Sequence, residues 1–372
     1  MQTTKKSAVL TALPYIILFI FFLLAPVFFK TRSWLNSFIM IFVSLVGACS
    51  LRTISLSGNM SFAHGAFIGV GAYVAGVLAK SFGVSMWLTI PIGAVAALVL
   101  GLLTGWPFSR LRSVYFVMGS MFMGVAIIQV ISALKITGGA NGLTGIPSLG
   151  KTLGVLFKGE GWQRLFEKLG VGSVQLSYYF FFLIMLISLV CLYRFEHSRI
   201  GWTLKALSQS PAVAASIGIN ERFYRLLSVG IGCFFAGLIG ATYAHYNTAL
   251  STNSYGMGLT LWLIMYMMVG GKDHFLGPIV GAILLEIINQ FTTILTAISG
   301  NANVSEGFVA FSRWVGTFSA YSPFLMAAVL IVIAYLIPGG LVSIPSVIRG
   351  AFNKKRIRKG AAALEGGEGD VA

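Results

Sequence analysis

Charged residues are scarce in this sequence, and carboxylates are the scarcest of them. Of 372 residues, 10% are charged, with 26 Lys and Arg against only 10 Asp and Glu, whereas 57% are hydrophobic. A soluble globular chain carries about 25% charged residues, so this composition excludes that class and indicates an integral membrane protein. The net charge of +16 is spread over the ends of apolar segments, which favours contact with anionic lipid headgroups over binding of nucleic acid.

Sequence motifs typical of disulfide frameworks, metal sites and catalytic sites are also lacking. Cys49, Cys191 and Cys233 all fall inside apolar segments, and an odd, scattered set supports neither a disulfide framework nor a metal site. The patterns H-E-x-x-H and G-x-S-x-G are absent. The sequence therefore predicts neither an enzyme nor a protein with a metal or cofactor of its own.

One phosphate-binding pattern is present without its structural context. Residues 145–152, GIPSLGKT, match G-x-x-x-x-G-K-T letter for letter. A P-loop needs a buried strand before it and a helix after it within an α/β domain. This segment instead follows TGGANGLT in a loop that the topology below places outside the cell, so we reject it as a nucleotide site.

Apolar runs recur at lengths that suit membrane-spanning helices. A bilayer core about 30 Å thick needs roughly 20 apolar residues per helix. Because a chain in lipid must satisfy its backbone within helices or a closed barrel, we expect an all-α, polytopic membrane fold. The predicted spans are 13–29, 34–56, 62–79, 84–106, 113–134, 176–193, 223–247, 258–270, 276–298 and 323–337.

These ten spans divide at the long loop 135–175 into two halves of five. Half one covers about 13–134 and half two about 176–337. An odd number of spans in each half places the halves in opposite orientations, as in inverted-repeat transporters. The transmembrane domain would then occupy residues 1–345, followed by a tail, 346–372, that is basic and then disordered.

Basic residues near span ends predict the orientation. Lys and Arg are retained on the cytoplasmic side, and most of them fall there if both termini and the loop 194–222 are cytoplasmic. Lys30 and Arg32 run against this arrangement. We therefore expect the 194–222 loop inside the cell and the 135–175 loop outside.

The third span of each half is interrupted. Polar and glycine-rich stretches, Ser55–Gly65 and Ala249–Gly258, precede apolar remainders too short to cross the bilayer alone. Irregular backbone at membrane depth is tolerated where it lines a cavity, so these stretches are candidates for a solute pathway. Ordinary turns at the membrane surface are the alternative, and His64 by itself suits a structural role. The candidate pathway residues are Ser57, Asn59, Ser61, His64, Ser251, Thr252, Asn253 and Ser254.

Glu286 is the one carboxylate deep in a predicted span. An intramembrane ionisable residue is a functional candidate, here a proton or cation site in an ion-coupled transporter. Its nearest polar neighbours in sequence are Asn289 and Gln290, and no span offers an evident basic partner. A hydrogen-bonded, neutral Glu between helices is the equal alternative.

The polar stretch Arg194–Asn220 contains residues that favour the start and the end of a short helix. Ser210 is a favoured N-cap, Pro211 suits the first helical position and Gly218 suits the left-handed position after the last turn. A helix of about seven residues is unstable alone in water, so it must pack on something. A groove on a partner protein and the chain's own bundle are both open.

Three segments, in order, resemble a known family. SLSGNMSFAHGAFIGVGAYVA, TGGANGLTGIP and SRIGWTLKALSQSPAVAASIGIN resemble motifs of the membrane subunits of branched-chain amino-acid ABC importers. The likeness runs from about Ser55 to Pro345, and in that family the third motif is the cytoplasmic EAA-type loop that docks the ATP-binding subunit. By this resemblance the chain is a permease of the bacterial plasma membrane that does not itself hydrolyse ATP.

The resemblance implies site residues and partners. Ile219 and Asn220 match the docking motif, whereas at two positions this chain lacks the acidic residues common in the family. The implied ATPase-coupling residues are Arg199, Gly201, Pro211, Ala215 and Gly218, of which Pro211 and Ala215 are the two departures. Implied partners are a second permease subunit, two cytoplasmic ATP-binding subunits and an external solute-binding protein docking on 135–175 and 299–322.

More than one substrate and more than one class of membrane protein are compatible with the sequence. The resemblance implies a branched-chain amino acid, while urea, short amides and other amino acids stay open because related permeases share the motifs. From the residues alone, an ion-coupled secondary transporter using Glu286 and a structural membrane scaffold are the competing classes.

Overall fold

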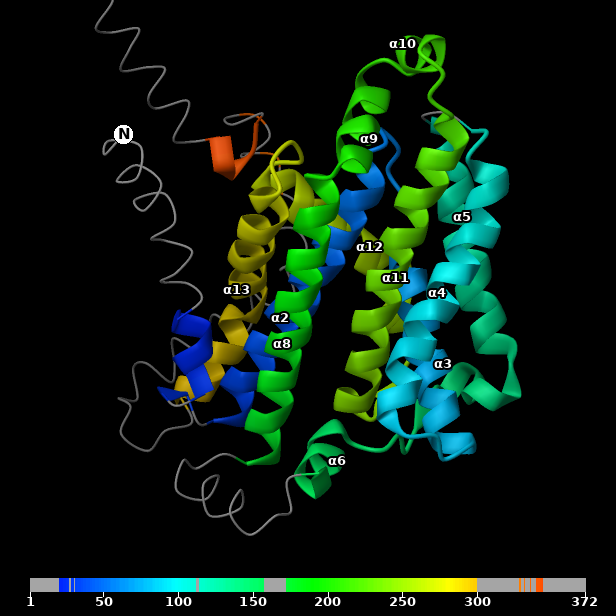
Figure 1. Cartoon of the computed structure of the whole chain (residues 1–372). Helices are drawn as coiled ribbons and strands as arrows, with labels where there is room; N and C mark the ends of the chain where they lie inside the picture. Colours follow the sequence, from blue (N-terminus) through cyan, green and yellow to red (C-terminus); the bar gives the residue numbers. More distant parts are fainter. Residues whose placement is uncertain are drawn as a thin grey trace, which may run out of the picture.

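The computed structural model describes residues 20–26, 28–29, 31–111, 114–156 and 172–299, together with 328, 331, 335 and 339–343. Within them the chain is built mainly from α-helices (Figure 1). The longer helices are α2 (Arg32–Ser55), α3 (His64–Ser81), α4 (Met86–Phe108), α5 (Val114–Ala133), α8 (Ser173–Glu196), α9 (Arg199–Gln209), α11 (Glu221–Asn247), α12 (Met257–Gly270) and α13 (Leu276–Ser299). The short elements are η1 (Lys135–Thr137), η2 (Gly139–Asn141), β1 (Leu143–Thr144), α6 (Leu149–Leu156), α10 (Pro211–Ser216), β2 (Ala249–Leu250), η3 (Thr252–Tyr255) and η5 (Leu341–Ser343).

The expectation of a helical membrane protein is confirmed. Helices occupy every predicted span from 34–56 to 276–298, whereas 13–29 lies partly and 323–337 mostly outside the described residues. Among the residues described, α2, α4, α5, α8 and α11 are long and apolar enough to cross a membrane. The full set of ten spans in two inverted halves stays a prediction.

Glycines allow α3, α4 and α11 to pack backbone against backbone. A Cβ on Gly93 would lie 2.7 Å from the Gly71 carbonyl oxygen, and one on Gly101 would lie 2.6 Å from Cys233 Sγ. A side chain larger than hydrogen at these positions would push the helices apart. Such small-residue contacts are the usual basis of helix association in lipid.

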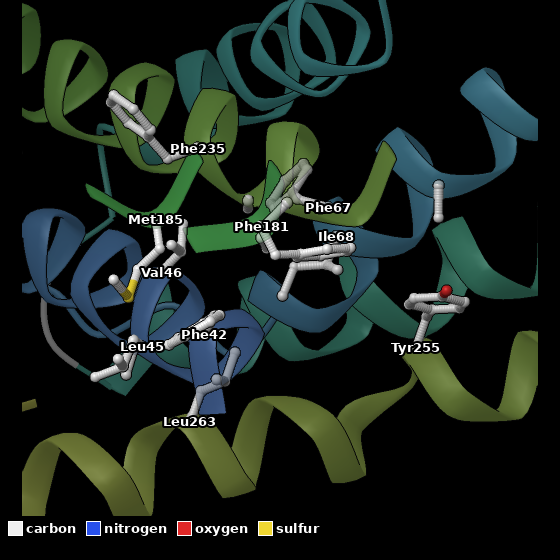
Figure 2. Close-up of a cluster of buried hydrophobic side chains, with 14 of the residues drawn as sticks. Phe42, Leu45, Val46, Phe67, Ile68, Phe181, Met185, Phe235, Tyr255 and Leu263 are labelled. Carbon is white, nitrogen blue, oxygen red and sulfur yellow. The ribbon is translucent and has the colours of Figure 1, made fainter. Parts of the chain in front are cut away.

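The interior is filled by aliphatic and aromatic side chains from several helices. Figure 2 shows Phe42, Leu45 and Val46 of α2 together with residues of α3, α8, α11 and α12. Outward-facing residues of α4 and α5 are also apolar, with Leu103 66% and Phe122 66% exposed. Apolar residues inside and outside are expected for a bundle whose surroundings are hydrocarbon.

The bundle has two distinct ends (Figure 1). The α10 end comprises α9, α10 and the C-terminal ends of α2 and α8. The α6 end comprises α6, β1, β2 and the N-terminal ends of α2 and α8. The 194–222 loop and the described part of the 135–175 loop therefore lie at opposite ends, as the predicted topology requires.

Two local interactions anchor the 143–148 segment at the α6 end. β1 pairs antiparallel with β2, with Leu143 opposite Leu250. His245, fully buried in α11, has Nε2 2.8 Å from Thr89 Oγ1 and Nδ1 3.1 Å from the Pro147 carbonyl oxygen. In the described part of the chain the only sheet is this two-stranded one, which gives residues 145–152 no P-loop framework.

Candidate functional site

The predicted docking loop folds into two helices joined at Ser210. α9 begins after Ser198, whose Oγ accepts a hydrogen bond from the Gly201 amide at 3.3 Å. Gly201 is tightly enclosed, since a Cβ there would lie 2.6 Å from the Phe195 carbonyl oxygen. The absence of a side chain at Gly201 thus lets the chain turn sharply from α8 into α9.

The bounds of α10 agree closely with those predicted from the sequence. Pro211 occupies its first turn, and it ends at Ser216, one residue before the predicted end. Gly218, at φ +83°, donates its N–H to the Ala215 carbonyl at 3.0 Å, and the next amide, Ile219, donates to Ala214 at 3.1 Å. These two bonds form a Schellman motif. Ser210 is the N-cap residue, as predicted, although its side chain makes no capping hydrogen bond.

The α10 end exposes large apolar side chains. Trp202 is 61%, Val213 61%, Ile217 73% and Phe223 58% exposed, and they lie on α9, α10, the residue after α10 and the first turn of α11. We call these four residues the apolar cap. Of the predicted coupling residues, Arg199, Ala215 and Gly218 are exposed, Pro211 is half-buried and Gly201 is buried. An exposed apolar set at the tip of a protein marks an interaction surface.

A buried ion cluster lies directly beneath this surface. Arg52, in the last turn of α2, forms a bidentate pair with Glu196, the last residue of α8, and its Nη2 lies 3.0 Å from Glu196 Oε1. Lys205 of α9 places Nζ 2.8 Å from the same oxygen. Arg52 also donates from Nε to the Lys272 carbonyl at 2.9 Å and from Nη2 to the Asp273 carbonyl at 3.2 Å. We call Arg52, Glu196 and Lys205 the ion cluster.

Sequence reasoning did not find the ion cluster. In the sequence, Arg52 is one of many basic residues at the ends of apolar runs, and no motif singles out Glu196. The available signal was an Arg and a Glu each at the end of an apolar run on the same predicted side of the membrane. That pattern permits a pair without specifying one, because the partners are 144 residues apart.

α9 also contacts the interrupted stretch before α3. Gly58, at φ +84°, packs so closely that a Cβ would lie 3.3 Å from both Cα and Cβ of Ser208. Between α9, the α2 end and the turn after α12 lies a cavity of about 580 Å³, lined by Arg52, Asn59, Lys205, Ser208, Lys272 and Asp273 among others. The 194–222 loop is thus in direct contact with the segment that leads into α3.

The two broken third spans meet one another. The Gly65 amide donates to Thr260 Oγ1 at 2.8 Å, and a Cβ on Gly65 would lie 2.8 Å from the Gly256 carbonyl oxygen. One turn further along α3, a Cβ added to Gly69 would lie 2.8 Å from the Cβ of Tyr255. The N-terminal ends of α3 and α12 are therefore in contact. At roughly 1.5 Å per residue, the 18 residues of α3 and the 14 residues of α12 remain shorter than a bilayer core.

The predicted pathway residues do not gather in one cavity. Ser57, Asn59, Ser61, His64 and Thr252 are buried, whereas Ser251, Asn253 and Ser254 are exposed. Asn59 lines the cavity beneath α9, and Ser61 lines a separate small one of about 20 Å³. His64 is at the junction of the third spans, with Nε2 2.8 Å from Ser50 Oγ and Nδ1 buried without a partner.

Glu286 is hydrogen-bonded on both oxygens. Oε2 accepts from Tyr266 at 2.7 Å and from Ser44 at 3.2 Å, and Oε1 accepts from Gln290 Nε2 at 3.0 Å. The donors come from α12, α2 and α13 itself. Among the described residues no cation is paired with Glu286, and the side chain links three helices.

Comparison with known proteins supplies a family. The profile described as branched-chain amino acid transport system, permease component, matches residues 33–334. The chain is 26% identical over 246 residues to the high-affinity branched-chain amino acid transport system permease protein LivM of Escherichia coli, covering 64% of this chain and 58% of that protein. No solved structure matches the chain.

Two further relatives are more distant but more fully covered. One is described as a probable branched-chain amino acid transport permease, LivH, of Methanocaldococcus jannaschii; it is 24% identical over 285 residues, which are 75% of this chain and 82% of that protein. The other is the nucleoside ABC transporter permease NupC of Lactococcus lactis, 24% identical over 262 residues, covering 64% of this chain and 81% of NupC.

Proposed function

Because the chain belongs to the branched-chain amino acid transport system permease family, we propose that it is the membrane-spanning subunit of an ATP-binding-cassette importer. Its solute is a branched-chain amino acid or a related small polar molecule. Partner ATPases bind and hydrolyse ATP and act on this chain through the 194–222 loop. The observation that carries the proposal is the apolar cap, an exposed apolar surface on the loop that contacts the broken third span.

The geometry supports a route for coupling. The partner ATPases grip the apolar cap and displace α10 and α9 when they bind ATP. Ser208 of α9 lies against Gly58, and the segment from Gly58 leads into α3, whose start touches α12. Displacement of α9 therefore acts on both broken spans and switches access to the pathway between them.

The assembly we propose follows the predicted topology. Ten spans in two inverted halves place both termini and the α10 end in the cytoplasm of a bacterial cell, with the α6 end outside the plasma membrane. A second permease subunit completes the pathway, and a solute-binding protein docks on 135–175 and 299–322. Anionic lipid balances the basic span ends, and nucleic acid is not a partner.

ATP-driven uptake of radiolabelled leucine tests the proposal. The chain is reconstituted in vesicles with a second permease subunit, the ATPases and the binding protein encoded beside it. We expect uptake with ATP and none without it. Unlabelled isoleucine, urea and adenosine as competitors then define the solute class, since a nucleoside permease is among the relatives. Uptake driven by a proton gradient alone would contradict the proposal.

Glu286 supports the competing class, an ion-coupled transporter, because it is a buried carboxylate within the bundle. Its three hydrogen-bond donors suit a structural acceptor equally well. Glu286→Gln separates the two roles, since an amide keeps an oxygen for Tyr266 and Ser44 but carries no titratable charge. We expect ATP-driven uptake by Glu286→Gln within about twofold of the parent protein, as for a neutral replacement that keeps the hydrogen bonds from Tyr266 and Ser44 and loses the one from Gln290.

A further inference from the structure

The ion cluster occupies the point where the docking loop meets the transmembrane bundle. Glu196 ends α8, Arg52 lies in the last turn of α2, and Lys205 is in the middle of α9. Arg52 is 2% and Glu196 3% exposed, so both charges are removed from water. We propose that this cluster is the positioning device that makes movement of α9 move the segment leading into α3. The inference rests on the function proposed above.

The bonding pattern suits transmission of movement. Arg52 holds Glu196 with two nitrogens and the turn after α12 through the Lys272 and Asp273 carbonyls. A guanidinium paired in this bidentate way fixes orientation as well as distance. Three elements, α2, α8 and the 271–275 turn, are therefore clasped as one unit.

Lys205 connects α9 to that unit. Its ammonium group reaches Glu196 Oε1 from the α9 side, and its side chain is 28% exposed, at the rim of the cavity. Further along α9, Ser208 lies against Gly58. α9 thus touches the unit at one place and the 56–63 segment at another, and the cavity of about 580 Å³ between α9, the α2 end and the turn after α12 leaves room for relative movement.

Because the charges are buried, the ion pairs that link α9 to α8 and α2 are stable only while Glu196 stays bonded to its partners. A buried charge without its partner is strongly unfavourable, whereas hydrophobic contacts tolerate sliding. Glu196 is the only carboxylate in the cluster and is shared by Arg52 and Lys205. When α9 shifts, Glu196 either keeps Lys205 and carries α8 and α2 along, or loses it. A neutral residue in place of Lys205 removes this constraint while leaving the Arg52–Glu196 pair intact.

The first test is Lys205→Met in the complete complex, with the ATP hydrolysed per leucine transported as the readout. Met keeps an unbranched side chain and removes the charge. We expect ATP hydrolysis to persist while transport per ATP falls about tenfold, a typical coupling effect, and Lys205→Arg to restore the parent ratio. Lys272→Met is the matched control: it makes the same charge change in the same cavity, but Lys272 contacts Arg52 through its backbone carbonyl.

A second test locks the contact directly. Gly58→Cys with Ser208→Cys, in a protein whose exposed Cys191 is Ser, places two thiols within disulfide reach. Because the disulfide ties α9 covalently to the segment leading into α3, its oxidation in the Lys205→Met background is expected to raise the leucine transported per ATP towards the parent value, and a reductant is expected to remove that gain. An unchanged amount of leucine transported per ATP in Lys205→Met, failure of the disulfide to form, or no gain on oxidation in the Lys205→Met background would each overturn the inference. Absence of ATP-driven uptake in the parent complex would instead overturn the proposed function.

Discussion

At the α10 end, Arg52, Lys205 and Arg225 are each paired with a carboxylate, whereas at the α6 end Arg32 and Lys151 line an open pocket of about 570 Å³ among neutral polar residues. The described carboxylates lie at the α10 end or, for Glu286, within the bundle. Paired, buried charges fix the relative positions of helices. Exposed cations without a nearby carboxylate leave a surface open to an acidic partner or to lipid headgroups. Among the described residues, the charges at the α10 end thus form ion pairs between or within helices, whereas those at the α6 end line an open pocket.

The largest effect is expected from breaking the ion cluster. Arg52→Ala leaves Glu196 buried with Lys205 as its remaining cation and leaves two backbone carbonyls without their donor. We expect a loss of about 3–5 kcal/mol in stability, as for other broken buried pairs, measured by thermal unfolding in detergent. Arg110→Ala, at the same end but exposed over the Trp106 ring, is the control and should cost less than about 1 kcal/mol.

The apolar cap comes next, because its effect appears in binding instead of folding. Val213→Ser with Ile217→Ser removes two exposed apolar contacts from α10. We expect affinity for the purified ATPase to fall at least about tenfold, as for interface anchors, with thermal unfolding unchanged. Leu103→Ser, an equally exposed apolar change on α4, should leave ATPase affinity as it is. Equal loss in both variants would remove the apolar cap from the proposal.

Substitution of one glycine in each of two short helical segments, α10 with its following turn and α6, compares the two ends of the bundle. Gly218 follows α10 with a positive φ, whereas Gly154 lies in α6 with nothing within 4 Å of an added Cβ. Ala at Gly218 should destabilise the α10 turn by about 1–2 kcal/mol, seen as faster amide exchange across 211–219. Ala at Gly154 should stabilise α6 by up to about 1 kcal/mol. Similar changes at both positions would contradict the Schellman geometry.

The smallest stability effect is expected at the α6 end. Arg32→Gln with Lys151→Gln removes two exposed cations, so stability should change by less than about 0.5 kcal/mol. Uptake should nevertheless become less sensitive to salt, because charge attraction at this pocket is screened by ions. Lys80→Gln, an exposed cation on the last turn of α3 that does not line the pocket, is the control. A salt dependence unchanged in the double variant would argue against charge attraction at this pocket.

Local features were predictable because they depend on neighbouring residues. The Pro211 start and Gly218 end of α10 follow from the fixed φ of proline and the left-handed freedom of glycine. The interruptions before α3 and α12 followed from polar and glycine residues next to short apolar runs. Ser210 is the N-cap residue of α10, but residue type alone does not specify whether its hydroxyl makes a capping hydrogen bond, because that depends on the side-chain rotamer.

Features that join distant segments were not predictable. Arg52 meets Glu196 across 144 residues, Ser44 meets Glu286 across 242, and Gly58 meets Ser208 only once α9 is placed. Each partner alone has an ordinary interpretation as a span-end charge, a span hydroxyl or a turn glycine. Their pairing depends on how α2, α8 and α13 are packed, which a single sequence does not reveal.

Sequence alone establishes that this chain is a helical membrane protein with a short helix between Ser210 and Gly218 and with polar interruptions before the apolar helices that begin at His64 and Met257, because hydrophobicity, proline and glycine act over a few residues. The contact of the 194–222 loop with Gly58, the meeting of α3 and α12 at Gly65, and the buried site shared by Arg52, Glu196 and Lys205 depend on the tertiary structure. Helix packing brings these groups together, and in a low-dielectric interior only fully bonded charges are stable.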